Sequence, residues 1–296
     1  MYSPSASPRG AAGEGGEPGI GPSSRGLWLM GSDVDLARRL ARAGFDWIAL
    51  DAQHGAIDRS ALVGLGRALG DVGTNFVVRV PGVEHSWIGA SLDAGAAGVI
   101  IPSVASVEDA QAGVAATFYP PLGERSWGPF TPMWDAEAPD AEEANALVQC
   151  AVMIETAGAL EAVEEIAALD GVGLLFLGPV DLSLALGTTV PELLEAKGAS
   201  DPVPRILAAA RRHGKDVAAF AGHPATVPVL RAIGIDRIAV ATDIALVALG
   251  AQRVLELTDP PGAPPSSLPS GTPPSSESAE VSDDPPANVR ERMTEA

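Results

Sequence analysis

A regular alternation between short apolar runs and stretches with helical spacing constrains the fold of this chain most strongly. Eight apolar runs of four or five residues recur over about 230 residues, a length typical of strands. Most are followed by apolar residues at helical spacing, such as Leu62, Leu65 and Leu69, and glycines such as Gly44 and Gly95 stand where these helices would end. The runs cover residues 27–30, 47–50, 76–80, 98–101, 150–154, 173–177, 216–220 and 237–240.

Eight strand–helix units in this length predict an α/β fold of the (β/α)8 or TIM-barrel type. A doubly wound open sheet is the main competing fold. The dinucleotide-binding version of that sheet carries a Gly-x-Gly-x-x-Gly turn after its first strand, and this chain has no such turn there. The pattern therefore favours the closed barrel.

The two ends of the chain differ in composition from the middle. Residues 1–24 are mostly Gly, Pro, Ser and Ala, and residues 259–296 combine Pro-Pro and Ser-rich runs with acidic patches. Such segments bury too little apolar surface to offset the entropy of ordering, so we expect both tails to be disordered. We assign the barrel to residues 25–258. The acidic tail is predicted to be a solvating segment, with a docking or regulatory role as the alternative.

Charge and composition restrict the partners of the chain. A net charge of −19 argues against a general nucleic-acid binder and against docking on anionic lipid, both of which require clustered Lys and Arg. The single cysteine, Cys150, excludes an internal disulfide framework and is typical of a reducing compartment. No apolar run approaches the roughly 18 residues of a membrane span, and the first 25 residues hold no secretory apolar core. We expect a soluble, cytoplasmic protein.

Two acidic residues, Glu155 and Asp181, come just after apolar runs and lie 26 residues apart. Burying a carboxylate is costly unless it is paired, hydrogen-bonded or bound to a metal. Two carboxylates at neighbouring strand ends therefore suggest a divalent cation held by oxygen ligands. Each could instead be a helix N-cap or a salt-bridge partner.

Two further polar residues lie at the ends of the second and third runs, His54 and Arg79. Chemistry in a barrel takes place at the carboxyl ends of the strands, which is where this pattern places them. Arg79 inside an apolar run is tolerable if its guanidinium meets an anion, with a structural ion pair to a neighbouring Asp as the alternative. His54 is a candidate general base, or a histidine of a surface loop.

Taken together, these motifs resemble the HpcH/HpaI aldolase family, the metal-dependent class II pyruvate aldolases. The resemblance covers about residues 26–257 and rests on segments 43–54, 92–102, 119–125, 154–156 and 177–187. It implies a TIM barrel assembled as a trimer or hexamer. It also implies Mg²⁺, Mn²⁺ or Co²⁺ chelated by Glu155 and Asp181, and reversible cleavage of a 4-hydroxy-2-oxo acid to pyruvate, or a close analogue, and an aldehyde through a metal-stabilised enolate.

The resemblance also implies catalytic roles. Arg79 would hold the keto oxygen and stabilise its developing charge, and His54 would move the proton of the aldehyde-derived hydroxyl. Asp93 would orient the His54 ring and favour its charged form. It would do so either within the chain or across a subunit contact.

Substrate binding is assigned to Gly178, Pro179 and Arg125. The segment after Arg125, residues 125–130, departs from the family pattern, which leaves the choice of aldehyde open. The resemblance places Gln53 where the family usually has Glu, and the loss of this charge would affect metal preference or rate.

Two other functional interpretations of the same residues compete with the aldolase. A CoA-thioester lyase of the citrate lyase β-subunit type would share the Glu and Asp ligands, but it usually lacks the histidine block that contains His54. A catalytically silent barrel with an interaction tail would not need His54, Arg79, Glu155 and Asp181 together.

Overall fold

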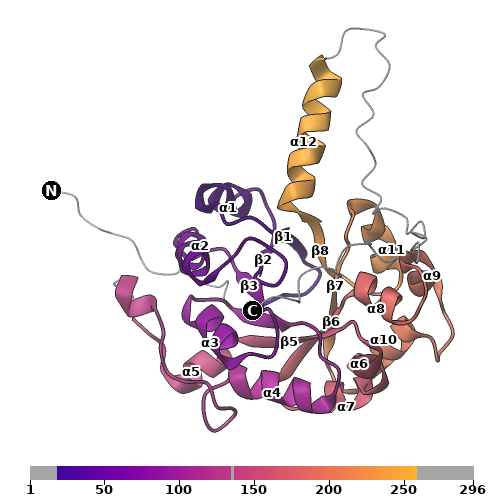
Figure 1. The fold of residues 1–296 in the computed structure, drawn as a ribbon, viewed down its shortest axis with the longest axis horizontal. Coiled ribbons are helices and arrows are strands. Elements are labelled where there is room, and N and C mark those ends of the chain that lie inside the picture. The colour runs from indigo at the N-terminus through magenta and orange to yellow at the C-terminus, as the bar shows by residue number, and fades with distance from the viewer. Residues whose placement is uncertain (1–18, 135–136, 259–296) are drawn as a thin grey trace, which may run out of the picture. The chain divides into compact units, whose positions relative to one another are not determined.

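The computed structural model describes residues 19–134 and 137–258, and within them eight parallel strands close into a barrel (Figure 1). Each strand pairs with the next one in the chain, and β8 pairs with β1, which confirms the predicted (β/α)8 fold. Every residue of β2 is buried, as expected for a parallel strand covered on both sides. The strands are β1 Arg25–Leu29, β2 Trp47–Asp51, β3 Phe76–Arg79, β4 Gly98–Ile101, β5 Gln149–Ile154, β6 Val172–Leu177, β7 Asp216–Phe220 and β8 Arg237–Thr242.

Helices connect the strands, and polar side chains begin several of them. Asp33 and Asp58 accept hydrogen bonds from the first-turn amides of α1 and α2, at 2.7 and 2.8 Å. The helices are α1 Val34–Ala41, α2 Arg59–Asp71, α3 His85–Asp93, α4 Val107–Thr117, α5 Ala141–Ala146, α6 Ala157–Glu161, α7 Val163–Ala168, α8 Pro179–Ala185, α9 Val190–Glu195, α10 Pro202–Arg212, α11 Val227–Ala232 and α12 Asp243–Thr258. Two 3-10 turns, η1 Thr131–Trp134 and η2 Pro224–Thr226, complete the described elements.

The apolar core has two layers. Side chains on the outer side of the strands pack against the helices, and those on the inner side fill the barrel. The inner layer includes three large aromatic rings, Trp28, Trp47 and Phe176. Because these rings fill the interior, the barrel is a packed core and its chemistry is confined to the rim.

The segment before β1 closes the amino-terminal end of the barrel. Ile20 is fully buried in the inner layer, and its amide donates to Gln149 Oε1 at 3.1 Å. The Trp47 indole donates to Ser24 Oγ at 3.1 Å at this same end. The composition assigned residues 19–24 to the disordered lead, but Gly19, Ile20 and Ser24 of this segment are buried in the fold, because the isoleucine fills the end of the barrel.

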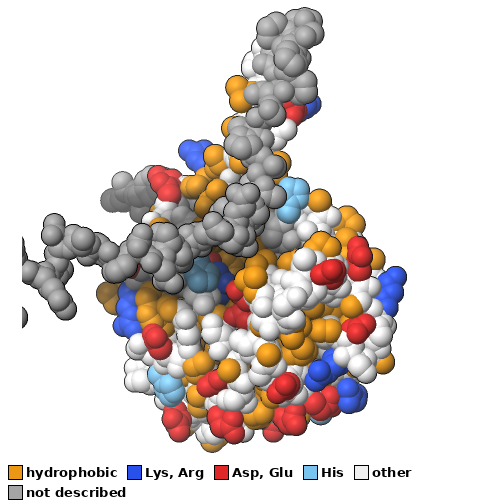
Figure 2. All heavy atoms as spheres, turned by 45° about the vertical axis from the view of Figure 1, so that its right-hand side comes forward, with side chains coloured by type: hydrophobic (Ala, Val, Ile, Leu, Met, Phe, Trp, Pro, Cys, Tyr) orange, Lys and Arg blue, Asp and Glu red, His pale blue; other side chains and the backbone are white. Residues whose placement is uncertain are grey.

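By its contacts the chain divides into two compact units, residues 1–249 and 250–296, and the division falls inside α12. The barrel belongs to the first unit, and the second is described over residues 250–258. Most of the predicted tails, residues 1–18 and 259–296, lie outside the described residues. Within the described ranges no helix is long and apolar enough to cross a membrane. On the face drawn in Figure 2, Asp and Glu are scattered among apolar side chains and Lys and Arg form no large patch.

Candidate active site

The carboxyl ends of the strands bring six of the predicted site residues to one end of the barrel: His54, Arg79, Glu155, Gly178, Pro179 and Asp181. Asp51 ends β2 and Arg79 ends β3, and these two residues pair directly in the register of the sheet. Glu155 directly follows β5, and Asp181 lies in the first turn of α8, just after β6. Since β5 and β6 are neighbours, the two predicted metal ligands come from adjacent strands.

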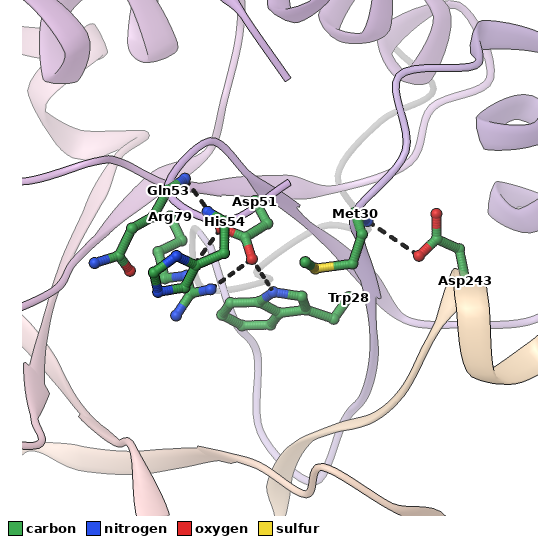
Figure 3. Close-up of polar contacts among 7 residues, drawn as sticks. All are labelled: Trp28, Met30, Asp51, Gln53, His54, Arg79 and Asp243. Carbon is green, nitrogen blue, oxygen red and sulfur yellow. Dashed lines mark hydrogen bonds and ion pairs between the residues drawn. The ribbon is translucent and has the colours of Figure 1, made fainter. Parts of the chain in front are cut away.

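The carboxylate of Asp51 organises this end of the barrel. It is fully buried, and it accepts hydrogen bonds from Arg79 Nε at 3.0 Å and Arg79 Nη2 at 2.5 Å. The Trp28 indole N–H donates to Oδ2 at 3.0 Å, and the amides of Gln53 and His54 donate to Oδ1 at 3.0 and 3.1 Å (Figure 3). One side chain therefore holds the Arg79 guanidinium and the start of the His54 loop together.

The environment of Asp51 favours its charged form. Burial by itself would raise the pKa of this carboxyl, but the hydrogen bonds and positive charge of Arg79 outweigh burial, with help from Trp28 and the His54 amide, so its pKa lies below the usual value. Arg79 thus makes the structural ion pair that the sequence left open. Asp51 engages Nε and Nη2, and within the described residues Nη1 makes no hydrogen bond, so it can donate to another acceptor.

The His54 loop turns tightly over the end of β1. A Cβ on Gly55 would come within 2.3 Å of the Asp51 carbonyl oxygen and 2.7 Å of the Met30 carbonyl oxygen, so the turn requires glycine. The Met30 amide in turn donates to Asp243 Oδ1 at 3.1 Å, which ties the end of β1 to the start of α12 (Figure 3). His54 itself is exposed, so its ring is accessible to a ligand.

Glu155 is buried and only half satisfied. Its Oε1 accepts the Ser103 amide at 2.6 Å, whereas its buried Oε2 has no hydrogen-bond partner among the described residues. Burial raises the pKa of Glu155, and the charge of Asp181 raises it further. The Ser103 amide and the charges of Arg79 and His54 lower the pKa by less.

Ser103 holds its amide toward Glu155 through an unusual backbone conformation. Its φ of 56° lies in the left-handed region, which is uncommon for a residue other than glycine. Such strain of about 1–3 kcal/mol concentrates at functional sites. The strained turn after β4 aims one N–H at Oε1 of Glu155.

The residues at this end fit a divalent cation. A buried carboxylate oxygen that lacks a partner, together with a second carboxylate in the first turn of the neighbouring helix, supplies the hard oxygen donors that Mg²⁺ and Mn²⁺ prefer. Among the described residues no group of three or more His, Cys, Asp or Glu could hold a metal. The two carboxylates would thus need water or substrate oxygens to complete the shell, which is the usual arrangement for Mg²⁺.

Gly178 leaves the space that Glu155 occupies. A Cβ at this position would lie 2.6 Å from Glu155 Oε2 and 2.8 Å from its Cβ. Gly178 is the N-cap of α8, and Pro179 follows it as the buried first residue of the helix. These two predicted substrate-binding residues therefore lie directly beside the carboxylates.

Asp93 and Arg125 lie at the opposite end of the barrel. Asp93 is the last residue of α3, five positions before β4 begins, and Arg125 follows α4. The two side chains form a partly buried ion pair at 2.8 Å, and the Arg125 guanidinium lies 4.4 Å from the centre of the Tyr119 ring. Burial raises the pKa of Asp93 against the opposing effect of Arg125. The structure of one chain does not bring this pair to His54, so their catalytic and substrate roles stay predictions.

Sequence reasoning did not assign Trp28, Asp51 and Ser103 to the site. Asp51 carried a signal, because it is a carboxylate that continues an apolar run without a break. Trp28 and Ser103 had no comparable signal: the first reads as an ordinary core residue, and the second acts through its backbone.

Known proteins resemble this chain in sequence and in fold. The model of the HpcH/HpaI aldolase/citrate lyase family matches residues 24–248, most of the chain. The chain belongs to this family. The match confirms the resemblance drawn from the motifs, and its limits agree closely with the barrel from β1 to the first turns of α12.

Curated relatives carry aldolase names. The chain is 39% identical over 169 residues to the 4-hydroxy-2-oxovalerate aldolase of Novosphingobium aromaticivorans, a match that covers 56% of this chain and 64% of that protein. It is 32% identical over 228 residues to the hydroxypyruvate/pyruvate aldolase of Rhizorhabdus wittichii, covering 77% and 91%. The match to the first relative thus spans a little under two thirds of that protein's length.

Solved structures show the same architecture. The HpcH/HpaI aldolase/citrate lyase family protein of Burkholderia cenocepacia J2315 superimposes with a TM-score of 0.71 at 30% identity, over 81% of this chain and 94% of that one. The HpcH/HpaI aldolase of Desulfitobacterium hafniense gives a TM-score of 0.70 at 28% identity, over 82% and 95%. The described fold is therefore that of the family.

We expect Asp51→Asn to lower the free energy of unfolding by about 3 kcal/mol at pH 7, because it leaves the Arg79 guanidinium buried without its counter-charge. The folded pKa of Asp51 is depressed, so the ion pair stabilises the protein above the unfolded pKa and loses this effect as pH falls through the folded pKa. The difference between variant and wild type should therefore shrink below about pH 4. Urea unfolding between pH 7 and pH 3 measures this difference in the free energy of unfolding.

Asp46→Asn is the matched control, because Asp46 pairs with Arg25 on an exposed surface. Its effect should stay below about 1 kcal/mol. A difference for Asp51→Asn that grows on acidification would contradict the assigned charge state.

Proposed function

We propose that this chain is a divalent-metal-dependent aldolase that reversibly cleaves a 4-hydroxy-2-oxo acid to an aldehyde and pyruvate, or a hydroxypyruvate-like analogue. One observation carries the proposal: the buried Glu155 Oε2 has no partner among the described residues, and Glu155 lies within electrostatic reach of Asp181, Arg79 and His54. The aldolase names of the relatives support this reaction class.

Glu155 and Asp181 would hold Mg²⁺, Mn²⁺ or Co²⁺. Bound there, the cation supplies a Lewis acid that polarises the oxo acid. The raised pKa of Glu155 supports this role, because a buried carboxylate with a free oxygen gains most from a positive partner. The Ser103 amide holds Oε1, which leaves Oε2 as the oxygen directed to a ligand.

Arg79 stabilises the charge that develops during cleavage. As the C3–C4 bond breaks, its electron pair moves toward the C2 keto oxygen, which becomes negative. The guanidinium is fixed by Asp51 through Nε and Nη2, so Nη1 can donate to this oxygen without any rearrangement. A donor aligned in advance is the arrangement that stabilises such charge most effectively.

His54 acts on the proton of the 4-hydroxyl. Removal of this proton lets C4 leave as an aldehyde, and a proton added at C3 then completes pyruvate. His54 suits this task because its ring is exposed and its backbone is anchored by Asp51. In the condensation direction the same ring returns the proton to the new hydroxyl.

A Schiff-base route would need a lysine at this end of the barrel. The sequence contains two lysines, Lys197 and Lys215. Lys215 lies just before β7, at its amino-terminal end, where it donates to the Leu169 carbonyl. Lys197 follows α9. Their positions favour the carboxylate-based mechanism.

Substrate contacts follow from the elements beside the carboxylates. Gly178 and Pro179 form the start of α8, and the first-turn amides that follow them, of Val180 and Asp181, can meet the carboxylate of the oxo acid. Arg125 is proposed to bind substrate only as part of an assembly, because it lies at the other end of its own barrel. It would then serve the site of a neighbouring chain.

The proposal is tested by a coupled assay for pyruvate release from 4-hydroxy-2-oxo acids. Activity should vanish with EDTA and return when Mg²⁺, Mn²⁺ or Co²⁺ is restored, because two carboxylates alone provide no Lewis acid. Glu155→Gln and Asp181→Asn should each lower kcat by at least about a hundredfold. Release that survives EDTA, or no release with any metal and any tested acid, would contradict the proposal.

The metal assignment can also be tested without turnover. Gly178→Ala should weaken Mn²⁺ binding by about tenfold or more, close to 1.4 kcal/mol, because the added methyl displaces the Glu155 carboxylate. Isothermal titration calorimetry measures the affinity. Gly89→Ala is the control, since a Cβ there meets no atom within 4 Å. Equal affinity in the two variants would remove Glu155 from the metal site.

We propose that the chain self-associates as a trimer or hexamer. Large apolar side chains are exposed on the surface of the first unit, including Leu184 of α8 at 72% and Val247 of α12 at 63%. Exposed apolar surface of this kind marks interaction sites. Light scattering of the purified protein should give three or six times the 30.1 kDa chain mass. A monomer mass at micromolar concentration would contradict the proposal.

A further inference from the structure

Trp28 of β1 contacts both members of the Asp51–Arg79 pair. Its indole N–H donates to Asp51 Oδ2 at 3.0 Å, and its ring lies 5.0 Å from the Arg79 guanidinium carbon (Figure 3). A guanidinium at this distance from an aromatic ring is attracted by its π system. One side chain thus acts on the guanidinium directly and also through the carboxylate.

Oδ2 of Asp51 is shared between two donors, Trp28 Nε1 and Arg79 Nη2. The indole N–H therefore holds Oδ2 in place, and Oδ2 in turn holds Nη2 of the guanidinium. Asp51 is fully buried, so no bulk water can replace a lost donor at low cost. Without the indole N–H, Oδ2 would keep only its bond from Arg79 Nη2, so the carboxylate would lose one of its fixed points and could rotate, and the guanidinium would move with it.

The ring itself is held rigidly. Trp28 is 2% exposed, and its ring centre lies 5.7 Å from that of Phe176 and 5.2 Å from that of Phe220. Both contacts are tilted, an arrangement that aromatic pairs favour. The packed interior of the barrel is thereby connected to Arg79 at the rim.

We propose that Trp28 is a positioning residue for Arg79: it sets the direction of the free guanidinium edge by holding Asp51 and facing the guanidinium. The inference rests on the proposed function for its kinetic consequence, though its geometric content is independent of that function. Trp28 would act on the step in which charge develops on the keto oxygen. It would have little effect on ground-state binding of the oxo acid.

The chain contains a matched control for a buried indole. Trp47 is 1% exposed, belongs to the same inner layer and donates its N–H to Ser24 Oγ at 3.1 Å. It lies at the amino-terminal end of the barrel, away from Arg79. Trp47→Phe therefore replaces an equally buried indole with a smaller phenyl ring and removes one hydrogen bond. It should lower stability about as much as Trp28→Phe does.

The kinetic test compares kcat and KM for pyruvate release by the metal-loaded full chain. Trp28→Phe should lower kcat by about tenfold to a hundredfold and change KM by less than about threefold, because a displaced donor loses charge stabilisation in the transition state. It should slow exchange of the pyruvate methyl protons in D₂O to the same extent. Trp47→Phe should stay within about twofold of wild type in both measurements. Equal losses in the two variants, or an unchanged kcat in Trp28→Phe, would overturn the proposal.

Crystal structures of the two variants give a readout that does not depend on turnover. In Trp28→Phe, Arg79 Nε and Nη2 should no longer both donate to the Asp51 carboxylate. In Trp47→Phe both hydrogen bonds should remain. An unmoved guanidinium in Trp28→Phe would overturn the inference even if wild type proved inactive, so its failure is distinct from failure of the proposed function. If Trp28→Phe does not fold, 3-benzothienylalanine at position 28 keeps the bicyclic shape without the N–H, and the same outcomes apply.

Discussion

The arrangement of this site depends on one buried charge, the carboxylate of Asp51. A closed barrel with a packed interior offers it no water, so the fold must supply every donor that the charge requires. These donors come from β1, β3 and the loop after β2: the Trp28 indole, the Arg79 guanidinium and the amides of Gln53 and His54. Satisfying a single carboxylate thereby positions an electrophilic guanidinium and a histidine loop on the same rim.

Glu155 shows the opposite treatment of a buried carboxylate. One oxygen is satisfied by the Ser103 amide, and the other has no partner within the described chain. The pKa of Asp51 is lowered and that of Glu155 is raised, although both groups are buried, because Asp51 has a cation in contact and Glu155 does not. Asp51 therefore has a structural role with both oxygens hydrogen-bonded, whereas Glu155 keeps one oxygen that can bind a cation.

Much of the fold could be predicted from the sequence, because strand and helix periods are local and repeat along the chain. The eight predicted runs match β1 to β8 in order, and their closure follows from the parallel unit repeated eight times. Residues 19–24 could not be assigned in this way, since the burial of Ile20 depends on a cavity that exists only once the barrel has closed. Site residues at strand ends were predictable for the same local reason, and Glu155, Asp181, Arg79 and His54 all lie at the predicted end.

The sequence by itself determined the barrel, the strand ends and the family, because these depend on residue type and spacing along the chain. Tertiary structure alone decided what each side chain meets. It pairs Arg79 with Asp51, gives the Trp28 N–H to the same carboxylate, and places Asp93 with Arg125 at the other end. Such pairings join residues that are 23 to 32 positions apart, and a contact of that range depends on which strands become neighbours and which way each side chain faces.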